Sequence, residues 1–254
     1  MGRLDRPPLR VSSSAIKEGV RIMLRNPSAL LDYVVCGLNF SVEQQCPRLI
    51  KKLGGDSSVT AQYLSEIRYN ILLNRHIRNK LNGKHYGEMY APELLYVIVR
   101  QFKPNIIVET GVSSGVSSAY MLQALEDNEN GHLYSIDYPN HTMPDENRLL
   151  SGQESGFVIP KDLRQRWSLY IGRSKDLLDP ILTKAGSIDM FVHDSEHSYE
   201  NMLFEYCKVW KYIKDGGLLL SHDINENDAF KDFTMTIRKK PHEVYFSGIG
   251  IIKK

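Results

Sequence analysis

Two patterns of hydrophobic positions divide the chain near residue 84. In residues 11–84, apolar side chains recur at helical spacing, which predicts helices over 15–25, 28–40 and 60–81. From His85 onward, short apolar runs alternate with helical segments, as expected for a mainly parallel sheet covered by helices. We therefore expect an N-terminal helical extension, residues 1–84, followed by an α/β domain, residues 85–254.

The α/β part has seven apolar runs short enough to be strands. The expected strands cover residues 105–110, 132–137, 166–171, 188–193, 217–221, 242–246 and 248–253, with helices over 92–102, 116–125, 176–185 and 199–212. The last two strands are joined by a tight turn. Residues 138–165 interrupt the alternation, and a loop of this length is either a functional lid or substrate loop or a surface excursion.

Composition places the chain among soluble globular proteins. Of its 254 residues, 42% are hydrophobic and 24% charged, and the net charge of +2 is too small to indicate nucleic-acid binding. The apolar stretch over residues 29–40 contains Asp32 and is too short to span a membrane, and the first residues lack the apolar core of a secretion signal. Three cysteines without a Cys-x-x-Cys pair argue against a disulfide framework, so we expect a cytoplasmic protein.

The turn after the first strand carries a candidate cofactor site. A strand ending in Glu109 leads through Gly111 and Gly115 into a helix, the place where open α/β sheets bind nucleotide-like ligands. A dinucleotide fingerprint requires a glycine where this chain has Ser113, and Glu109 would repel a pyrophosphate. The carboxylate would instead attract an ammonium group, which favours S-adenosylmethionine.

A second carboxylate supports the same cofactor. Asp137 ends the following strand, where a carboxylate in doubly wound folds accepts hydrogen bonds from the ribose hydroxyls.

Acidic and imidazole side chains gather after the fourth and fifth expected strands. Asp194 and His197 follow one strand, and His222 and Asp223 follow the other. Parallel strands end at the same sheet edge, and two ionised carboxylates there require a proton or a cation between them. Asp194, His222 and Asp223 are therefore candidate ligands for Mg²⁺ or Mn²⁺. His197 is the candidate base for a substrate hydroxyl, because an imidazole titrates near neutral pH.

The segments 191–199 and 214–223 resemble the methyltransferase-24 family of class I S-adenosylmethionine-dependent methyltransferases, which includes antibiotic-sugar O-methyltransferases and is similar to the cephalosporin-hydroxylase-like group. The resemblance extends from about Tyr86 to Lys254. It implies a Rossmann-like seven-stranded sheet with a C-terminal antiparallel hairpin, Mg²⁺ at Asp194 and Asp223, and His197 as base. It also implies cofactor contacts from Asp194 and Ser174. His222 stands where some members have Glu, which leaves the identity of the metal open.

The function expected from this resemblance is metal-assisted methylation of a hydroxyl on a small molecule, such as a sugar or a secondary metabolite. Two alternatives stay open: a metal-independent N- or protein methyltransferase of the same fold, and a non-catalytic scaffold that binds an adenosyl ligand. The N-terminal helices could cap the site, line the substrate pocket or form a homodimer interface.

Overall fold

The computed structural model describes residues 42–254 apart from residues 87, 90, 140–148, 150–151 and 245–247. The predicted helices over 15–25 and 28–40 lie outside the described residues. The described residues form one compact unit. Within the described residues, no helix has the length and apolar character needed to cross a membrane.

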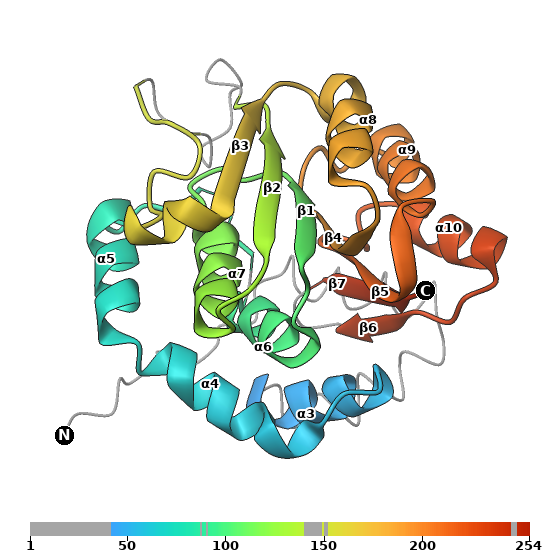
Figure 1. Cartoon of the computed structure of the whole chain (residues 1–254). Coiled ribbons are helices and arrows are strands. Elements are labelled where there is room, and N and C mark those ends of the chain that lie inside the picture. Colours follow the sequence, from blue (N-terminus) through green and yellow to red (C-terminus); the bar gives the residue numbers. More distant parts are fainter. Residues whose placement is uncertain (1–41, 87, 90, 140–148, 150–151, 245–247) are drawn as a thin grey trace, which may run out of the picture. The chain divides into compact units, whose positions relative to one another are not determined.

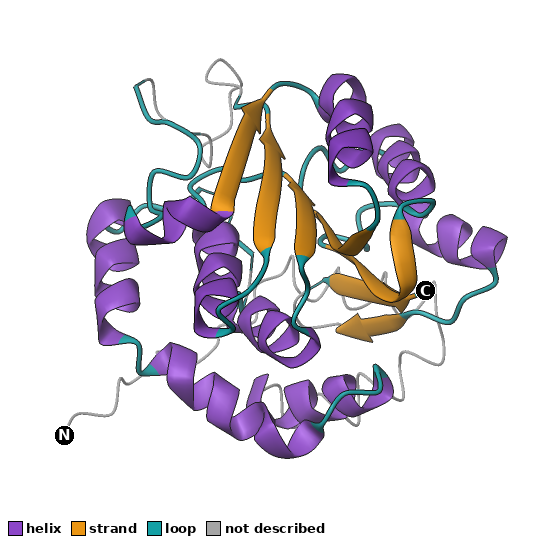
Figure 2. Ribbon diagram, viewed as in Figure 1, coloured by secondary structure: helices purple, strands orange, loops and turns teal. Residues whose placement is uncertain are grey.

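A seven-stranded sheet with the order β3-β2-β1-β4-β5-β7-β6 forms the centre of the described chain. β1 to β5 pair in parallel, whereas β7 runs antiparallel to both β5 and β6 (Figures 1 and 2). The predicted Rossmann-like sheet with a C-terminal hairpin is confirmed. The strands are β1 (Ile106–Thr110), β2 (His132–Asp137), β3 (Trp167–Ile171), β4 (Ile188–His193), β5 (Ile213–Ser221), β6 (His242–Val244) and β7 (Ile249–Lys253).

Successive side chains of the central strands enter two different cores, because strand residues alternate between the faces of a sheet. Ile107 packs in the core with α6 (Glu93–Phe102) and α7 (Val116–Asp127), whereas Val108 packs in the core on the other face. That second core contains residues of α8 (Ser174–Ala185), α9 (Tyr199–Val209) and α10 (Ala229–Ile237). Both faces are covered, which explains why these strands read as continuous apolar runs.

The helices before the sheet differ from the prediction in one respect. A single helix over 60–81 is wrong: α4 (Thr60–Arg68) and α5 (Ile71–Leu81) are separate. The break occurs because the Asn70 side chain accepts a hydrogen bond from the backbone N–H of Leu73 at 3.0 Å, which starts a new helix. α3 (Val42–Lys52), α4 and the short 3₁₀ turn Ser57–Val59 precede this break.

The α3–α5 segment packs on the sheet domain through α6. Cys46, Leu49 and Ile67 belong to the same buried core as the α6 residues Leu95 and Ile98. The boundary at residue 84 stays a prediction, since these helices share a core with the sheet.

Two further elements differ from the sequence pattern. α10 was not predicted, although its residues Phe230 and Phe233 are buried against the sheet. β5 begins at Ile213 rather than Gly217, because Ile213 already pairs with Ile188 before the register shifts at Leu218.

Candidate functional site

A cleft of about 750 Å³ lies at the carboxyl ends of the parallel strands. The turns after β1, β2, β4 and β5 and the start of α8 all contribute to its walls. Among the predicted site residues, those that line the cleft are Gly111, Ser113, Asp137, Ser174, Asp194, His197, His222 and Asp223. Glu109 and Gly115 are not part of its lining.

The first turn of the cleft is held by contacts between backbones. Gly111 has φ +87°, and a Cβ built on it would lie 1.9 Å from the carbonyl oxygen of Asp194. Gly115 has φ +94°, and its Cβ would lie 2.6 Å from the Cα of Gly156. Both glycines are therefore required by neighbouring chain segments, so their presence alone does not identify a ligand.

Ser113 occupies the position where a dinucleotide fingerprint has glycine. It adopts φ +49°, and its Oγ donates a hydrogen bond to the carbonyl oxygen of Tyr86 at 2.8 Å. The turn is thus attached to the segment that precedes α6, and both Ser113 and Tyr86 line the cleft.

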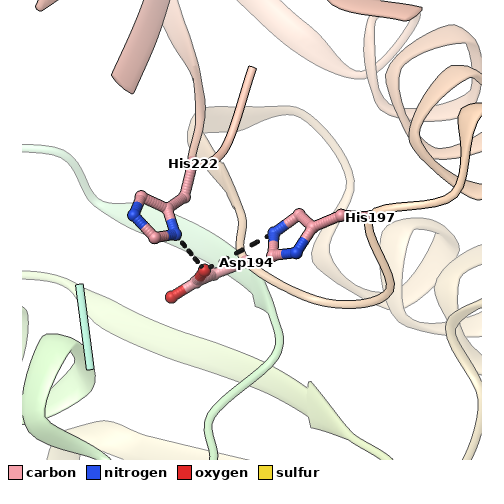
Figure 3. Close-up of side chains that lie close together, drawn as sticks. All are labelled: Asp194, His197 and His222. Carbon is pink, nitrogen blue, oxygen red and sulfur yellow. Dashed lines mark hydrogen bonds and ion pairs between the residues drawn. The ribbon is translucent and has the colours of Figure 1, made fainter. Parts of the chain in front are cut away.

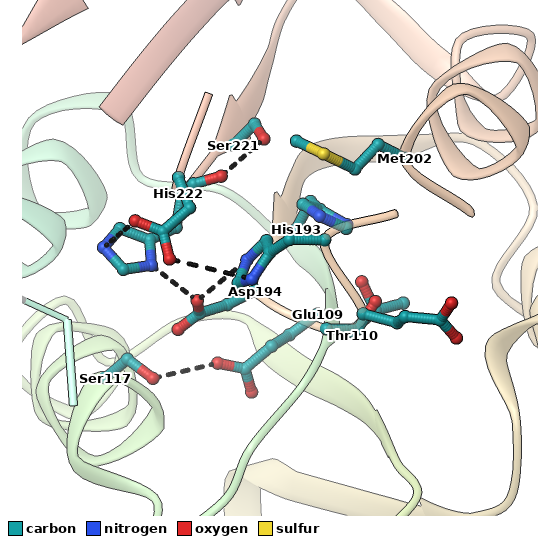
Figure 4. Close-up of polar contacts among 12 residues, drawn as sticks. Glu109, Thr110, Ser117, His193, Asp194, Met202, Ser221 and His222 are labelled. Carbon is teal, nitrogen blue, oxygen red and sulfur yellow. Dashed lines mark hydrogen bonds and ion pairs between the residues drawn. The ribbon is translucent and has the colours of Figure 1, made fainter. Parts of the chain in front are cut away.

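Glu109 lies beneath this turn with 0% of its surface exposed. Its carboxylate accepts hydrogen bonds from Ser118 Oγ and Ser135 Oγ, both at 2.7 Å, and from Ser117 Oγ at 3.4 Å. Figure 4 shows the Ser117 contact. Burial raises the pKa of Glu109 to about 8, against the lowering effect of the serine hydroxyls. The carboxyl group joins β1, β2 and α7, and a direct contact with a ligand stays a prediction.

Asp137 connects the cleft wall to the first turn. Its Oδ1 accepts from the backbone N–H of Val112 at 3.0 Å, and its Oδ2 accepts from Ser155 Oγ. Burial raises the pKa of Asp137 above its ordinary value, although these hydrogen bonds act in the opposite direction. The side chain lines the cleft at the end of β2, as predicted for a ribose-binding carboxylate.

A buried network below the cleft was missed by the sequence reading. Glu205 of α9 has no exposed surface and accepts hydrogen bonds from Thr110 Oγ1 at 2.6 Å and His193 Nδ1 at 2.7 Å. Its other oxygen accepts from Ser195 Oγ at 2.9 Å and from Asn201 Nδ2 at 3.2 Å. Although burial raises the pKa of Glu205, His193 and the other donors lower it below its ordinary value overall.

Ser174 reaches this network through Asn201, to whose Oδ1 its hydroxyl donates at 3.1 Å. A signal for Glu205 did exist in the sequence. Glu205 lies between Met202 and Val209 on the buried face of an amphipathic helix, and a carboxylate in that position needs buried hydrogen-bond partners.

Asp194, His197 and His222 converge at the far end of the cleft (Figure 3). His222 Nδ1 lies 2.8 Å from Asp194 Oδ1, and His197 Nε2 lies 3.8 Å from the same oxygen. Each of the three residues offers one possible metal-ligand atom, and these three atoms all lie within 4.8 Å of one another.

Asp223 faces the outer sides of the two imidazoles. Its carboxylate lies 3.6 Å from His197 Nδ1 and 3.5 Å from His222 Nε2, which are the ring nitrogens directed away from Asp194. The structure therefore brings His197 into the cluster and leaves Asp223 beyond the rings. Asp194 and Asp223 contact opposite nitrogens of His222, so the predicted ligand set of Asp194, His222 and Asp223 does not converge on one point.

The two histidines of the cluster differ in their electrostatic surroundings. Burial lowers the pKa of His197, and the nearby His193 lowers it further. Burial would also lower the pKa of His222, but its hydrogen bond to Asp194 and the charges of Asp194 and Asp223 raise it overall. The surroundings thus favour the neutral form of His197 and the protonated form of His222.

His193 lies beside this cluster, with its ring centroid 5.3 Å from that of His197. Its side chain is fully buried against Glu205.

Comparisons with known proteins agree with this fold. Residues 108–224 match the family model described as "Methyltransferase domain" (Methyltransf_24). No curated protein matches the chain as a sequence relative.

Two solved structures share the fold. The first is an O-methyltransferase from Bacillus cereus in complex with SAH, with 13% identity, a TM-score of 0.53, and coverage of 76% of this chain and 96% of that one. The second is the O-methyltransferase TomG from Streptomyces achromogenes, involved in tomaymycin synthesis and in complex with SAM, with 14% identity, a TM-score of 0.50, and coverage of 71% and 88%. Residues 108–224 therefore match the model of a methyltransferase domain, and the chain shares the fold of these two O-methyltransferases.

Proposed function

We propose that this protein transfers the methyl group of S-adenosylmethionine to a hydroxyl group of a small molecule. The observation that carries the proposal is the arrangement of the cleft. The Gly111 turn and Asp137 form one part of its wall, and His197 presents a buried ring nitrogen without a hydrogen-bond partner among the described residues. The structures of similar fold include O-methyltransferases named as complexes with SAH and SAM.

The cleft has the properties that the cofactor needs. A volume of about 750 Å³ falls in the usual range for sites that take a drug-sized ligand. Asp137 is the proposed acceptor for the ribose hydroxyls, and Ser113 and Ser174 are proposed as further contacts. When bound, S-adenosylmethionine supplies an electrophilic methyl group on a good leaving group.

Proton removal is the main chemical task left to the protein. We assign it to His197, because its Nε2 faces Asp194 and carries no hydrogen bond from the described residues. The lowered pKa of His197 keeps the ring neutral and able to accept a proton. The hydroxyl oxygen would form its bond to the methyl carbon as the methyl–sulfur bond of the donor breaks and S-adenosylhomocysteine leaves. The hydroxyl proton would pass to Nε2, and Asp194 would stabilise the resulting imidazolium.

Magnesium does not fit the cluster as the structure presents it. Mg²⁺ prefers an octahedral set of oxygen ligands. Here two imidazoles and one carboxylate converge, and the second carboxylate, Asp223, faces the outer ring nitrogens. The proposed reaction therefore does not depend on Mg²⁺.

The proposal is tested by two measurements on the same protein. Calorimetry should show one S-adenosylmethionine site per chain, and radiolabelled donor should transfer its methyl group to members of a panel of hydroxylated sugars and aromatic metabolites. His197→Ala is the matched variant, expected to bind the donor and lose transfer. Transfer only to amines or to protein would favour the second methyltransferase class, and binding without any transfer would favour a scaffold.

Other expectations from the sequence stay predictions. They are a cytoplasmic location, the absence of nucleic-acid and membrane partners, and assembly as a homo-oligomer.

A further inference from the structure

The side chains of Asp194, His197 and His222 lie close together at the edge of the cleft, with polar atoms facing one another. Asp194 Oδ1 lies 2.8 Å from His222 Nδ1 and 3.8 Å from His197 Nε2. Figure 3 shows the two rings on either side of the carboxylate. They come from the ends of β4 and β5 and from the loop before α9, so the sheet itself fixes two of the three.

Asp223 lies behind both rings. Its two oxygens are 3.6 Å from His197 Nδ1 and 3.5 Å from His222 Nε2. A carboxylate in this position favours the N–H on the nitrogen that it faces, which leaves the lone pair on the opposite nitrogen. For His197, this directs the Nε2 lone pair toward Asp194. His222 Nδ1 instead donates a hydrogen bond to Asp194 Oδ1 and would exchange that proton for the metal ion. Metal-binding histidines characteristically have such a carboxylate partner on the second nitrogen.

His197 provides an independent observation. Its Nε2 is buried and has no hydrogen-bond partner among the described residues. Buried polar atoms of this kind are uncommon in folded proteins. A bound cation would give this nitrogen a partner without moving the chain far, since all three atoms already lie within 4.8 Å of one another.

We infer that Asp194, His197 and His222 bind a divalent first-row transition metal in preference to Mg²⁺, with Asp223 orienting both imidazoles. Imidazole ligands suit Zn²⁺, Fe²⁺, Co²⁺ and Ni²⁺, whereas Mg²⁺ selects oxygen ligands. All three residues line the cleft, which leaves room on the ion for an oxygen of a ligand or for water.

This inference goes beyond the proposed function and assigns a second role to His197. In the metal-loaded protein, Nε2 is a ligand and cannot accept a proton, so its role as base applies to the metal-free protein. Metal binding is measured without methyl transfer. A protein that binds the ion but, once freed of metal, transfers no methyl group would overturn the proposed function alone.

The first experiment uses the wild-type protein after removal of metals with EDTA. Titration with Co²⁺ should give a visible d–d spectrum that saturates at one equivalent, and Zn²⁺ should displace Co²⁺. Mg²⁺ in large excess should leave the spectrum unchanged. Displacement of Co²⁺ by Mg²⁺ at comparable concentrations, or saturation at no defined equivalent, would overturn the inference.

Variants then identify the ligands. His197→Ala and His222→Ala should each weaken Co²⁺ binding more than Asp223→Asn, whose expected loss is about 10–100-fold with the stoichiometry retained. His132→Gln, which removes an imidazole at the opposite end of β2, is the matched control and should bind as the wild type does. Unchanged Co²⁺ affinity in His197→Ala, or a larger loss in Asp223→Asn than in either histidine variant, would show that the assigned ligands are wrong.

Discussion

The carbonyl oxygen of Asp194 occupies the space that a side chain on Gly111 would need. A Cβ at residue 111 would lie 1.9 Å from that oxygen. The backbone N–H of Asp194 also donates to the carbonyl oxygen of Thr110 at 2.8 Å. The turn after β1 therefore packs directly against the backbone of Asp194. This contact links the proposed donor-binding part of the cleft to the cluster of Asp194, His197 and His222.

Gly111→Ala should consequently damage both halves of the cleft. The methyl group would displace the Asp194 backbone in addition to straining φ +87°, so we expect a loss of about 3 kcal/mol or more in the free energy of unfolding. Urea denaturation followed by circular dichroism measures this loss. Gly83→Ala is the control, because residue 83 also has positive φ but open space around it, and it should cost only about 1–2 kcal/mol. Equal losses in the two variants would disprove the contact.

Glu109 should make the protein less stable as the pH rises. Burial raises its pKa from 4.5 to about 8 in the folded state, so between these values the folded chain holds a proton that the unfolded chain has lost. The free energy of unfolding therefore falls with rising pH across this window, by at most about 1.4 kcal/mol per pH unit, and the loss is complete above about pH 8.

Glu109→Gln should flatten this dependence, because the amide does not titrate. Melting temperatures of variant and wild type should diverge between pH 5 and pH 8, with the variant relatively more stable at the higher pH. Glu200→Gln changes an exposed glutamate and should reproduce the wild-type slope. Parallel profiles for wild type and Glu109→Gln would show that Glu109 titrates as an ordinary carboxyl group.

Much of the fold could be predicted from the sequence, because helices cover both faces of the sheet. Residues 106–110 and 188–193 are mostly buried on both faces and mainly apolar, which makes each strand a distinct run. The break at Asn70 was harder to find, because apolar spacing continues from Ile67 to Ile71 while a single side-chain cap decides the boundary. Periodicity reports burial, whereas helix ends depend on individual hydrogen bonds.

The sequence predicts the site only as far as the order of the strands determines it. The sheet order places Asp137, Asp194 and His222 at one edge, so the sequence could predict that they line one cleft. Which nitrogen of His222 faces Asp194 depends on side-chain rotation, and this decides that Asp223 lies behind the rings. The role of Glu109 was similarly hidden, because its serine partners come from α7 and β2.

Removal of the His197 imidazole should slow methyl transfer while leaving the donor site intact. His197→Ala eliminates the proposed proton acceptor, so we expect kcat to fall by about 10²–10⁴-fold. The affinity for S-adenosylmethionine, measured by calorimetry, should not change, because Asp137 and the Gly111 turn remain. Normal turnover in this variant would show that another group accepts the proton. His132→Gln again serves as the control and should retain the wild-type rate.

Replacing Glu205 should destabilise the protein more than any exposed substitution on α9. Glu205→Ala leaves His193 Nδ1, Thr110 Oγ1 and other buried donors without their acceptor. Loss of one partner from such a network costs about 3–5 kcal/mol in the free energy of unfolding. Glu200→Ala, an exposed position on the same helix, should stay within about 0.5 kcal/mol of the wild type. Urea denaturation compares the two variants, and similar midpoints would mean that the buried network contributes little. A large loss confined to Glu205→Ala would establish that this carboxylate stabilises the network below the cleft, through its hydrogen bonds to His193 and Thr110.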